Sequence, residues 1–245
     1  SYLQLAEEGF KKATELDPNL THVHMELAKL YEQQGDLEKS QIRYRLAVAD
    51  KPQSVEGWLK MGHLYLEKNE PYKAQNCFLK ALELDPASPD AHMELGLFYT
   101  QEGRHKEAIN EFKSVTTLKP TDEVAWFRLG TVYLSSGDLP AAEKALSQAK
   151  SVNPNYSDAS FNLGLTLFKQ GKTILAEKEW EYTIQVDPNH ARAFYNLGNL
   201  YRQQGQTDKA MAMYCRFIEA AGNRFPTEKS LARDLIDAND AKCRH

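Results

Sequence analysis

Apolar residues along this chain fall on two alternating helical stripes that recur through most of its length. In each recurring window, positions 4, 7, 8 and 11 lie within about 100° of one another on a helical wheel, and positions 20, 24 and 27 form a second stripe. Between the stripes, position 15 is Gly in five windows and Asn69 in the other, and both types tolerate the left-handed conformation that ends a helix. The pattern predicts paired helices, with Pro71 and Pro140 at helix starts, where a missing N–H is harmless.

A proline recurs every 34 residues and sets the length of the window, and the sixth full window carries Gly222 in its place. These prolines, at position 32 of the window, are Pro18, Pro52, Pro86, Pro120, Pro154 and Pro188. They define six full repeats, residues 21–54, 55–88, 89–122, 123–156, 157–190 and 191–224. Position 8 is small throughout, Ala28 or Gly, whereas position 24 is large throughout, as in Tyr44 and Trp180. A small residue on one helix and a large residue on the next predict a close approach of the two helices in each pair.

This combination resembles the tetratricopeptide repeat (TPR) family, whose pattern places an aromatic residue, Leu-Gly, Tyr, Ala, a second aromatic residue and a closing Pro at these spacings. The resemblance covers residues 1 to about 222. It implies an all-α fold, a right-handed superhelical solenoid of antiparallel helix pairs whose first helices line a concave side. It also implies a non-catalytic scaffold or adaptor that holds a peptide or a helical segment of another protein.

The two ends of the chain depart from the repeat. Residues 1–20 match only a second helix, with Ala6, Phe10 and Ala13 in its packing column. We therefore expect the array to continue upstream, or this open edge to be covered by a partner or a second copy. Residues 225–245 predict a capping helix and a tail, with the helix running from Thr227 to about Asp240. Its apolar face is expected to contain Leu231, Ala232, Leu235 and Ile236.

Positions 2, 5, 6, 9, 12 and 13 lie opposite the packing stripe of each first helix and are free to contact a ligand. In the middle repeats these positions form an apolar track of Met93, Leu97, Phe127, Leu134, Phe161, Leu165 and Phe168. Amide, hydroxyl and basic groups that can bind carboxylates or backbone carbonyls adjoin it at Arg128, Asn162, Arg192, Tyr195, Asn196, Asn199 and Arg202. Position 5 is apolar in all six repeats, so its residues could equally belong to the core between repeats.

The size of the ligand follows from energetics. Each buried apolar anchor contributes roughly 1.5 to 3 kcal/mol, whereas association costs on the order of 4 to 15 kcal/mol. Several anchors are needed at once, so the ligand is expected to be an extended or helical segment rather than a small molecule. Replacing Phe161 and Phe168 with Ala is expected to abolish its capture while leaving helicity intact.

The amides of Asn162, Asn196 and Asn199 are similar to those of the superhelical domain of the O-GlcNAc transferase family, in which an asparagine ladder grips peptide backbone. Only the last two repeats match, because position 6 carries a charged side chain in the first four. Family members that bind chaperone tails need Lys, Asn and Arg at set positions of three consecutive repeats. No three consecutive repeats here supply that pattern, so a chaperone tail is not the expected ligand.

Charge and motifs argue against other functions. The net charge of −4 disfavours nucleic acid as a partner, and no apolar run approaches the ~18 residues of a membrane span in this segment. His22 and His24 diverge by about 200° on a helix, and His24 falls in the packing column, so it is expected in the core rather than at a metal. No phosphate loop, GxSxG or HExxH motif points to a cofactor or to an enzyme.

The three cysteines, Cys77, Cys215 and Cys243, are odd in number and far apart. They lack the close pairing of a zinc or redox site, so we expect free thiols. Free thiols favour a reducing compartment such as the cytoplasm, although nothing else in the chain indicates a location.

Three hypotheses follow from the sequence. The first is a scaffold whose middle and C-terminal repeats hold a segment of a partner protein. The second, suggested by the partial asparagine ladder, is the substrate-recognition arm of a larger enzyme such as a TPR-containing glycosyltransferase. The third is self-assembly, in which the open N-terminal helix buries Leu3, Leu5 or Phe10 in another copy.

Overall fold

The computed structural model describes residues 2–17, 20–239 and 243, without the side chains of residues 2–4, 6 and 14. Pro18, Asp240 and the side chains of Leu3 and Ala6 therefore lie outside the described residues. The chain divides into two compact units, an N-terminal unit of residues 1–120 and a C-terminal unit of residues 121–245. Every regular element in the described residues is an α-helix, which confirms the predicted all-α fold.

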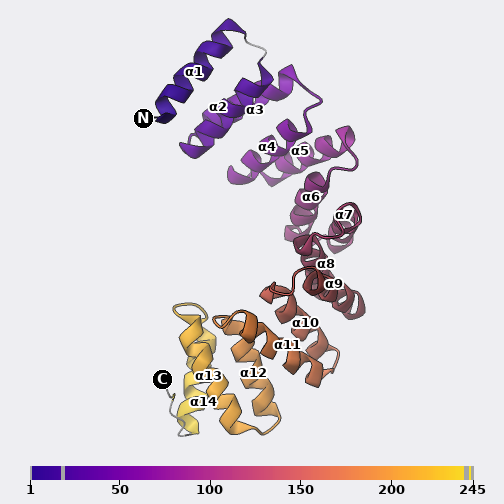
Figure 1. Cartoon of the computed structure of the whole chain (residues 1–245), viewed down its shortest axis with the longest axis vertical. Coiled ribbons are helices and arrows are strands. Elements are labelled where there is room, and N and C mark those ends of the chain that lie inside the picture. Colours follow the sequence, from indigo (N-terminus) through magenta and orange to yellow (C-terminus); the bar gives the residue numbers. More distant parts are fainter. Residues whose placement is uncertain (1, 18–19, 240–242, 244–245) are drawn as a thin grey trace. The chain divides into compact units, whose positions relative to one another are not determined.

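Each unit contains seven helices within the residues described (Figure 1). In the N-terminal unit they are α1 (Tyr2–Leu16), α2 (Thr21–Gln33), α3 (Leu37–Asp50), α4 (Val55–Glu67), α5 (Pro71–Leu84), α6 (Pro89–Gln101) and α7 (His105–Leu118). In the C-terminal unit they are α8 (Glu123–Ser136), α9 (Leu139–Val152), α10 (Ser157–Lys169), α11 (Thr173–Val186), α12 (Ala191–Gln203), α13 (Thr207–Ala221) and α14 (Pro226–Ala238). The even-numbered helices from α2 to α12 begin at the first residues of the six sequence repeats.

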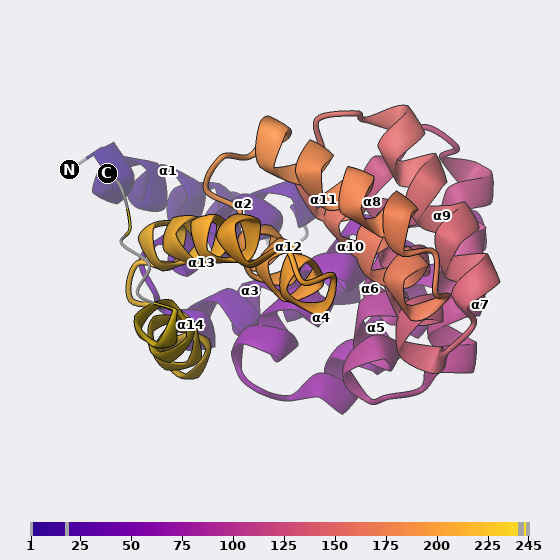
Figure 2. The ribbon, with the colours of Figure 1, turned by 90° about the horizontal axis from the view of Figure 1, so that it is seen from below.

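Consecutive helices pack as hairpins, and within each unit neighbouring hairpins pack on one another. In the N-terminal unit α2 pairs with α3, α4 with α5, and α6 with α7; in the C-terminal unit α8 pairs with α9, α10 with α11, and α12 with α13. Helix α1 packs on α2, and α14 lies against α13, as the views in Figures 1 and 2 both show. This is the arrangement of a TPR array, in which each hairpin buries its apolar face on its neighbours.

Local signals in the sequence set where the helices begin and end. Side chains that precede helices, such as Ser54 before α4 and Asp122 before α8, accept a hydrogen bond from a backbone N–H in the first turn. Position 15 of the repeat adopts the left-handed conformation that its sequence predicts, with φ of 85° at Gly137 and 59° at Asn69. Pro71 and Pro140 lie in the first turns of α5 and α9, as expected.

The small residue at position 8 is explained by its contact with position 24 of the same hairpin. A Cβ atom placed on Gly96 would lie 2.6 Å from Cε1 of Phe112, and one on Gly164 would lie 2.6 Å from Nε1 of Trp180. Contacts this short are not tolerated, so each ring presses directly on the backbone of the facing helix. The predicted close approach within each pair is confirmed.

The two end helices differ from their predicted form in part. Phe10 of α1 is half-buried and packs on the core of α2, whereas Leu5 is 70% exposed. In α14, Ala232 and Ile236 are buried as predicted, but Leu231 is 51% exposed. The prediction that Leu231 belongs to the buried face is wrong, because α14 packs on α13 with a stripe narrower than four residues.

The cysteine prediction is wrong for two of the three residues. Cys215 of α13 and Cys243 of the tail form a disulfide, with their Cα atoms 5.4 Å apart. Cys77 is a free, buried thiol, and burial raises its pKa to about 11. The argument for a reducing compartment rested on three free thiols and does not apply to this arrangement.

Candidate peptide-binding site

The predicted binding residues that come together most closely are in the C-terminal unit, around an open cavity of about 380 Å³ that we call the α10–α12 pocket. Its lining comprises Leu165, Phe168, Trp180, Tyr195, Asn196, Asn199, Leu200, Arg202 and Gln203. Helices α10 and α12 supply most of these residues because first helices of successive repeats stand side by side, and α11 supplies Trp180.

Aromatic side chains form the base of this pocket. The rings of Phe168 and Trp180 lie 5.7 Å apart, and those of Tyr195 and Phe217 lie 5.0 Å apart. Trp180 is 2% exposed, and its Nε1 donates a hydrogen bond to the backbone oxygen of Phe161 at 3.2 Å. The base is therefore rigid, whereas Phe168 and Tyr195 are half-buried and keep part of their surface open.

A hydrogen bond from a residue of α13 holds the polar wall of the pocket in place. The Tyr214 hydroxyl donates to Oδ1 of Asn199 at 2.8 Å, which fixes the amide and leaves its NH₂ group without a partner among the described residues. Burial raises the pKa of Tyr214, although the nearby Arg202 guanidinium opposes the rise. The Asn199 NH₂ group and Arg202 are thus donors beside an apolar base, which suits the carbonyl groups of a peptide.

A smaller, charged cavity of about 170 Å³ lies at the start of α12. His190 caps this helix by accepting a hydrogen bond at Nδ1 from the Ala193 backbone N–H at 3.2 Å. Its Nε2 lies 3.5 Å from the Asp158 carboxylate and lowers the pKa of Asp158. Arg192 and Arg128 lower the same pKa by their charge. Asp158 therefore offsets part of the positive charge that the sequence predicts here.

Phe161 is the one predicted binding residue whose side chain is buried. Its side chain is only 4% exposed, its ring lies 4.7 Å from that of His190, and Arg192 stands over it at 5.0 Å. It belongs to the core between repeats, the alternative left open for position 5. Truncating a buried Phe leaves a cavity, so Phe161→Ala is expected to lower the stability of the unit as well.

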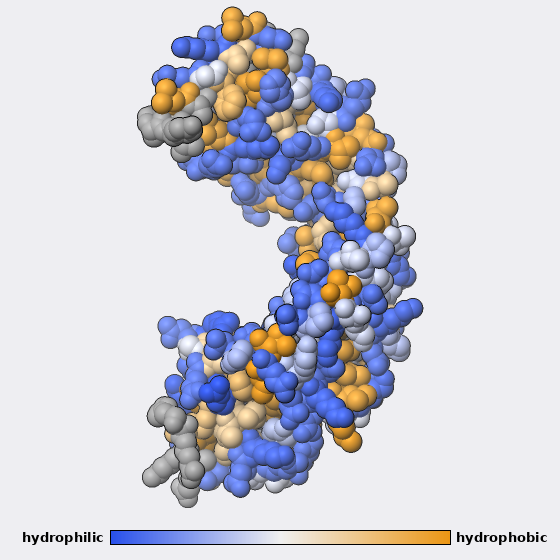
Figure 3. Space-filling view, in the orientation of Figure 1, coloured by the Kyte–Doolittle hydropathy of each residue, from blue (hydrophilic) through white to orange (hydrophobic). Residues whose placement is uncertain are grey.

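The remaining predicted residues are accessible to different extents. Those that are half-buried are Met93, Leu97, Phe127, Leu134, Asn162, Leu165, Phe168, Tyr195, Asn196 and Asn199, and those that are exposed are Arg128, Arg192 and Arg202. Met93 and Leu97 are on α6, in the N-terminal unit, and Phe127 is covered in part by the Tyr156 ring, 5.0 Å away. Figure 3 shows the mixture of apolar and hydrophilic surface over the helices of the C-terminal unit. The roles of these predicted residues in binding stay predictions.

The structure also adds residues that the sequence argument did not assign to a site. Trp180 was placed in the core by its repeat position, and only the geometry shows that its edge reaches the pocket. No signal in the sequence pointed to His190 or Asp158, because His is not among the residue types that usually cap a helix N-terminus.

The described residues also bear on His24, on metal ions and on membrane spans. His24 is 3% exposed, which confirms its predicted place in the core. No group of three or more His, Cys, Asp or Glu side chains that could hold a metal ion occurs among the residues described. None of the helices described is both long and apolar enough to cross a membrane.

Comparison with protein families places this array. The family described as the Cilia and flagella-associated protein 70 C-terminal domain, a TPR domain, matches residues 52–243. The chain belongs to this family. The match spans both units and includes the α10–α12 pocket, the α12 cap and both disulfide cysteines. No curated protein sequence matches the chain.

Solved structures share the fold at low sequence identity. The C-terminal part of a TPR repeat-containing protein from Cytophaga hutchinsonii is 18% identical, with a TM-score of 0.78 over 96% of this chain and 95% of that chain. YrrB, described as a TPR protein with an unusual peptide-binding site, is 23% identical, with a TM-score of 0.67 over 76% of this chain and 96% of that chain. MamA is 24% identical, with a TM-score of 0.64 over 70% of this chain and 94% of that chain. At these identities the likeness shows the fold alone, a TPR array.

Proposed function

We propose that the chain is a non-catalytic protein-interaction scaffold whose α10–α12 pocket holds an extended or helical segment of a partner protein. The observation that carries this proposal is the union, in one pocket, of half-open aromatic rings with the fixed amide of Asn199 and the guanidinium of Arg202. Apolar side chains of the partner would pack on Phe168 and Tyr195, while its backbone carbonyls accept from Asn199. The family name further suggests that this scaffold serves a protein assembly of cilia or flagella.

Two features favour a protein segment over a small molecule. The pocket is open, and the half-buried side chains of Asn162 on α10 and Leu134 on α8 extend the available surface beyond it. An extended surface with scattered anchors gives affinity only to a ligand that touches several of them at once. A neighbouring charged cavity, with Arg192 and Asp158, would then select the polar part of the segment.

Replacing Phe168 or Asn199 with Ala is expected to weaken binding of the partner segment roughly tenfold or more, because each supplies a central contact. Proteins crosslinked to the chain in ciliated cells would be identified by mass spectrometry, and the crosslinked segment synthesised for titration by isothermal calorimetry. Ile174→Ala is the matched control, since Ile174 is 69% exposed on α11 and does not line the pocket. Dissociation constants that are the same for wild type, Phe168→Ala and Asn199→Ala would refute the pocket assignment.

A further inference from the structure

The second helix of the first repeat carries apolar side chains at both positions 22 and 26, as no other full repeat does. Position 22 is Ile42 and position 26 is Leu46, and these side chains are 55% and 42% exposed. The equivalent pairs in the other repeats contain at least one polar or charged side chain each: Asn76 and Lys80, Asn110 and Ser114, Lys144 and Gln148, Lys178 and Tyr182, Ala212 and Arg216. Because the repeats share one fold, the difference is not required by packing, and it marks a surface with its own role.

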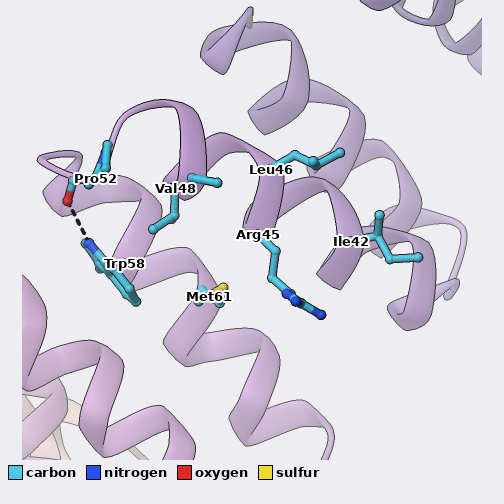
Figure 4. Close-up of a pocket in the computed structure, with 8 residues that line it drawn as sticks. Ile42, Arg45, Leu46, Val48, Pro52, Trp58 and Met61 are labelled. Atoms are coloured by element: carbon cyan, nitrogen blue, oxygen red, sulfur yellow. Dashed lines mark hydrogen bonds between the residues drawn. The ribbon is translucent and has the colours of Figure 1, made fainter. Parts of the chain in front are cut away.

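These two side chains border a cavity of about 630 Å³ between α3 and α4, which we call the α3–α4 pocket. Val48 and Met61, 6% and 8% exposed, line its buried part, and Trp58 forms a wall. Trp58 is held in place because its Nε1 donates to the Pro52 backbone oxygen at 3.0 Å, as Figure 4 shows. The pocket is thus preformed, and its volume is within the range of sites that enclose a ligand.

Arg45 is the single charged residue of this lining, and Figure 4 shows its side chain between Met61 and Ile42. Other charged side chains of α3 have partners: Glu38 lies 2.6 Å from Lys68, Lys39 lies 2.6 Å from Asp36, and Asp50 accepts from Thr21. Arg45 has no ion pair or hydrogen bond with any described residue. A guanidinium beside an apolar pocket is complementary to a carboxylate on an apolar ligand, since it can form two parallel hydrogen bonds to it.

We propose that the α3–α4 pocket is a second docking site, for an amphipathic helix of a partner protein that carries an Asp or Glu beside its apolar face. Ile42 and Leu46 are one helical turn apart, which matches apolar side chains spaced one turn apart on an approaching helix. The carboxylate of that helix pairs with Arg45. This site is in the N-terminal unit and shares no residue with the α10–α12 pocket, so it would bind a segment independently of that pocket.

A random-peptide display library selected on the full chain tests this site. Enriched peptides are expected to place two apolar residues one helical turn apart with an Asp or Glu adjacent to them. Their affinity should fall roughly tenfold or more for Ile42→Glu/Leu46→Glu and for Arg45→Glu, because the apolar contact or the charge pair is lost. Asn76→Glu/Lys80→Glu, at the same positions of the next repeat, is the matched control and should bind like wild type. The pocket variants should stay folded, because Ile42, Leu46 and Arg45 are exposed.

Three results would overturn the proposal. One is that peptides enriched on wild type bind Ile42→Glu/Leu46→Glu equally well. A second is a set of enriched peptides that lacks a carboxylate and is indifferent to Arg45→Glu. The third is concentration-dependent self-association that only Ile42→Glu/Leu46→Glu abolishes, since the occupant would then be a second copy. Repeating the selection on the Phe168→Ala variant separates the two sites. Peptides that bind the α3–α4 pocket should still be enriched, whether or not binding at the α10–α12 pocket is lost.

Discussion

Replacing Trp180 with Ala is expected to lower the free energy of unfolding of the C-terminal unit by about 3–5 kcal/mol, the usual cost of truncating a fully buried large aromatic residue. The indole is 2% exposed, packs on Phe168, and donates a hydrogen bond to the backbone oxygen of Phe161. The substitution leaves a cavity at the centre of the α10–α11 hairpin and removes that hydrogen bond. Urea denaturation followed by far-ultraviolet circular dichroism measures the loss.

The loss should be confined to the C-terminal unit, because hairpins of a repeat array contact only their neighbours. Hydrogen exchange is expected to accelerate in α10–α13 and to stay unchanged in α2–α5. Ile174→Ala on the same helix removes an exposed side chain and should change stability by less than about 0.5 kcal/mol. A loss for Trp180→Ala that is no larger than this control would show that the ring does not hold the hairpin together.

A second substitution tests why Trp180→Ala lowers the free energy of unfolding. Gly164→Ala alone should destabilise the protein, because its Cβ would lie 2.6 Å from Nε1 of Trp180. In the Trp180→Ala background the same change should stabilise it, since Ala favours a helix over Gly by about 1 kcal/mol when nothing obstructs the methyl group. A Gly164→Ala effect of the same sign in both backgrounds would mean that the contact between positions 8 and 24 is not the constraint.

This contact also explains how much of the fold the sequence could predict. A Gly facing a large ring recurs at a fixed spacing, so one local rule, repeated, gives the helix starts, the pairing and the core positions such as His24. Helix ends were equally readable, because Asn69 and the glycines at position 15 need the same left-handed backbone. Periodic features are predictable here because each copy tests the same inference.

The candidate site was predictable only in part, because its limits depend on non-periodic contacts. Phe161 and Phe168 stand on the same helix and in the same apolar track, yet the neighbouring His190 and Arg192 cover one and leave the other half open. A helical wheel places a residue on a face, but it does not say how far the next helix covers that face. The place of Asp158, which offsets the basic character of this region, could not be predicted for the same reason.

The repeat pattern could not predict the disulfide. Cys215 sits within a repeat, but Cys243 follows α14, beyond the six full repeats. The distance between them depends on how α14 folds back on α13, and no sequence period encodes that. Odd cysteine counts and long separations therefore gave no basis for pairing them.

Reduction of the Cys215–Cys243 disulfide is expected to destabilise α14 by about 3–4 kcal/mol, because the bond closes a loop with a sequence separation of 28 residues in the unfolded chain. Helix α14 depends on it heavily, since Ala232 and Ile236 are the only described residues of this helix that are fully buried. Hydrogen exchange in α14 should accelerate on adding dithiothreitol, while α10–α12 change little. Thiol titration in denaturant should count one free thiol before reduction, Cys77, and three after it.

The variant Cys215→Ala/Cys243→Ala separates the bond from other effects of the reductant. It should show fast exchange in α14 without dithiothreitol, and adding the reductant should change nothing further. In a thiol titration of the folded chain, Cys77 serves as the internal control. Its thiol is buried and burial raises its pKa, so it reacts slowly with the thiol reagent. If α14 exchanged equally slowly in the oxidised protein and in this double variant, the packing of Ile236 on α13 would suffice to hold the helix, and the disulfide would contribute little to its stability.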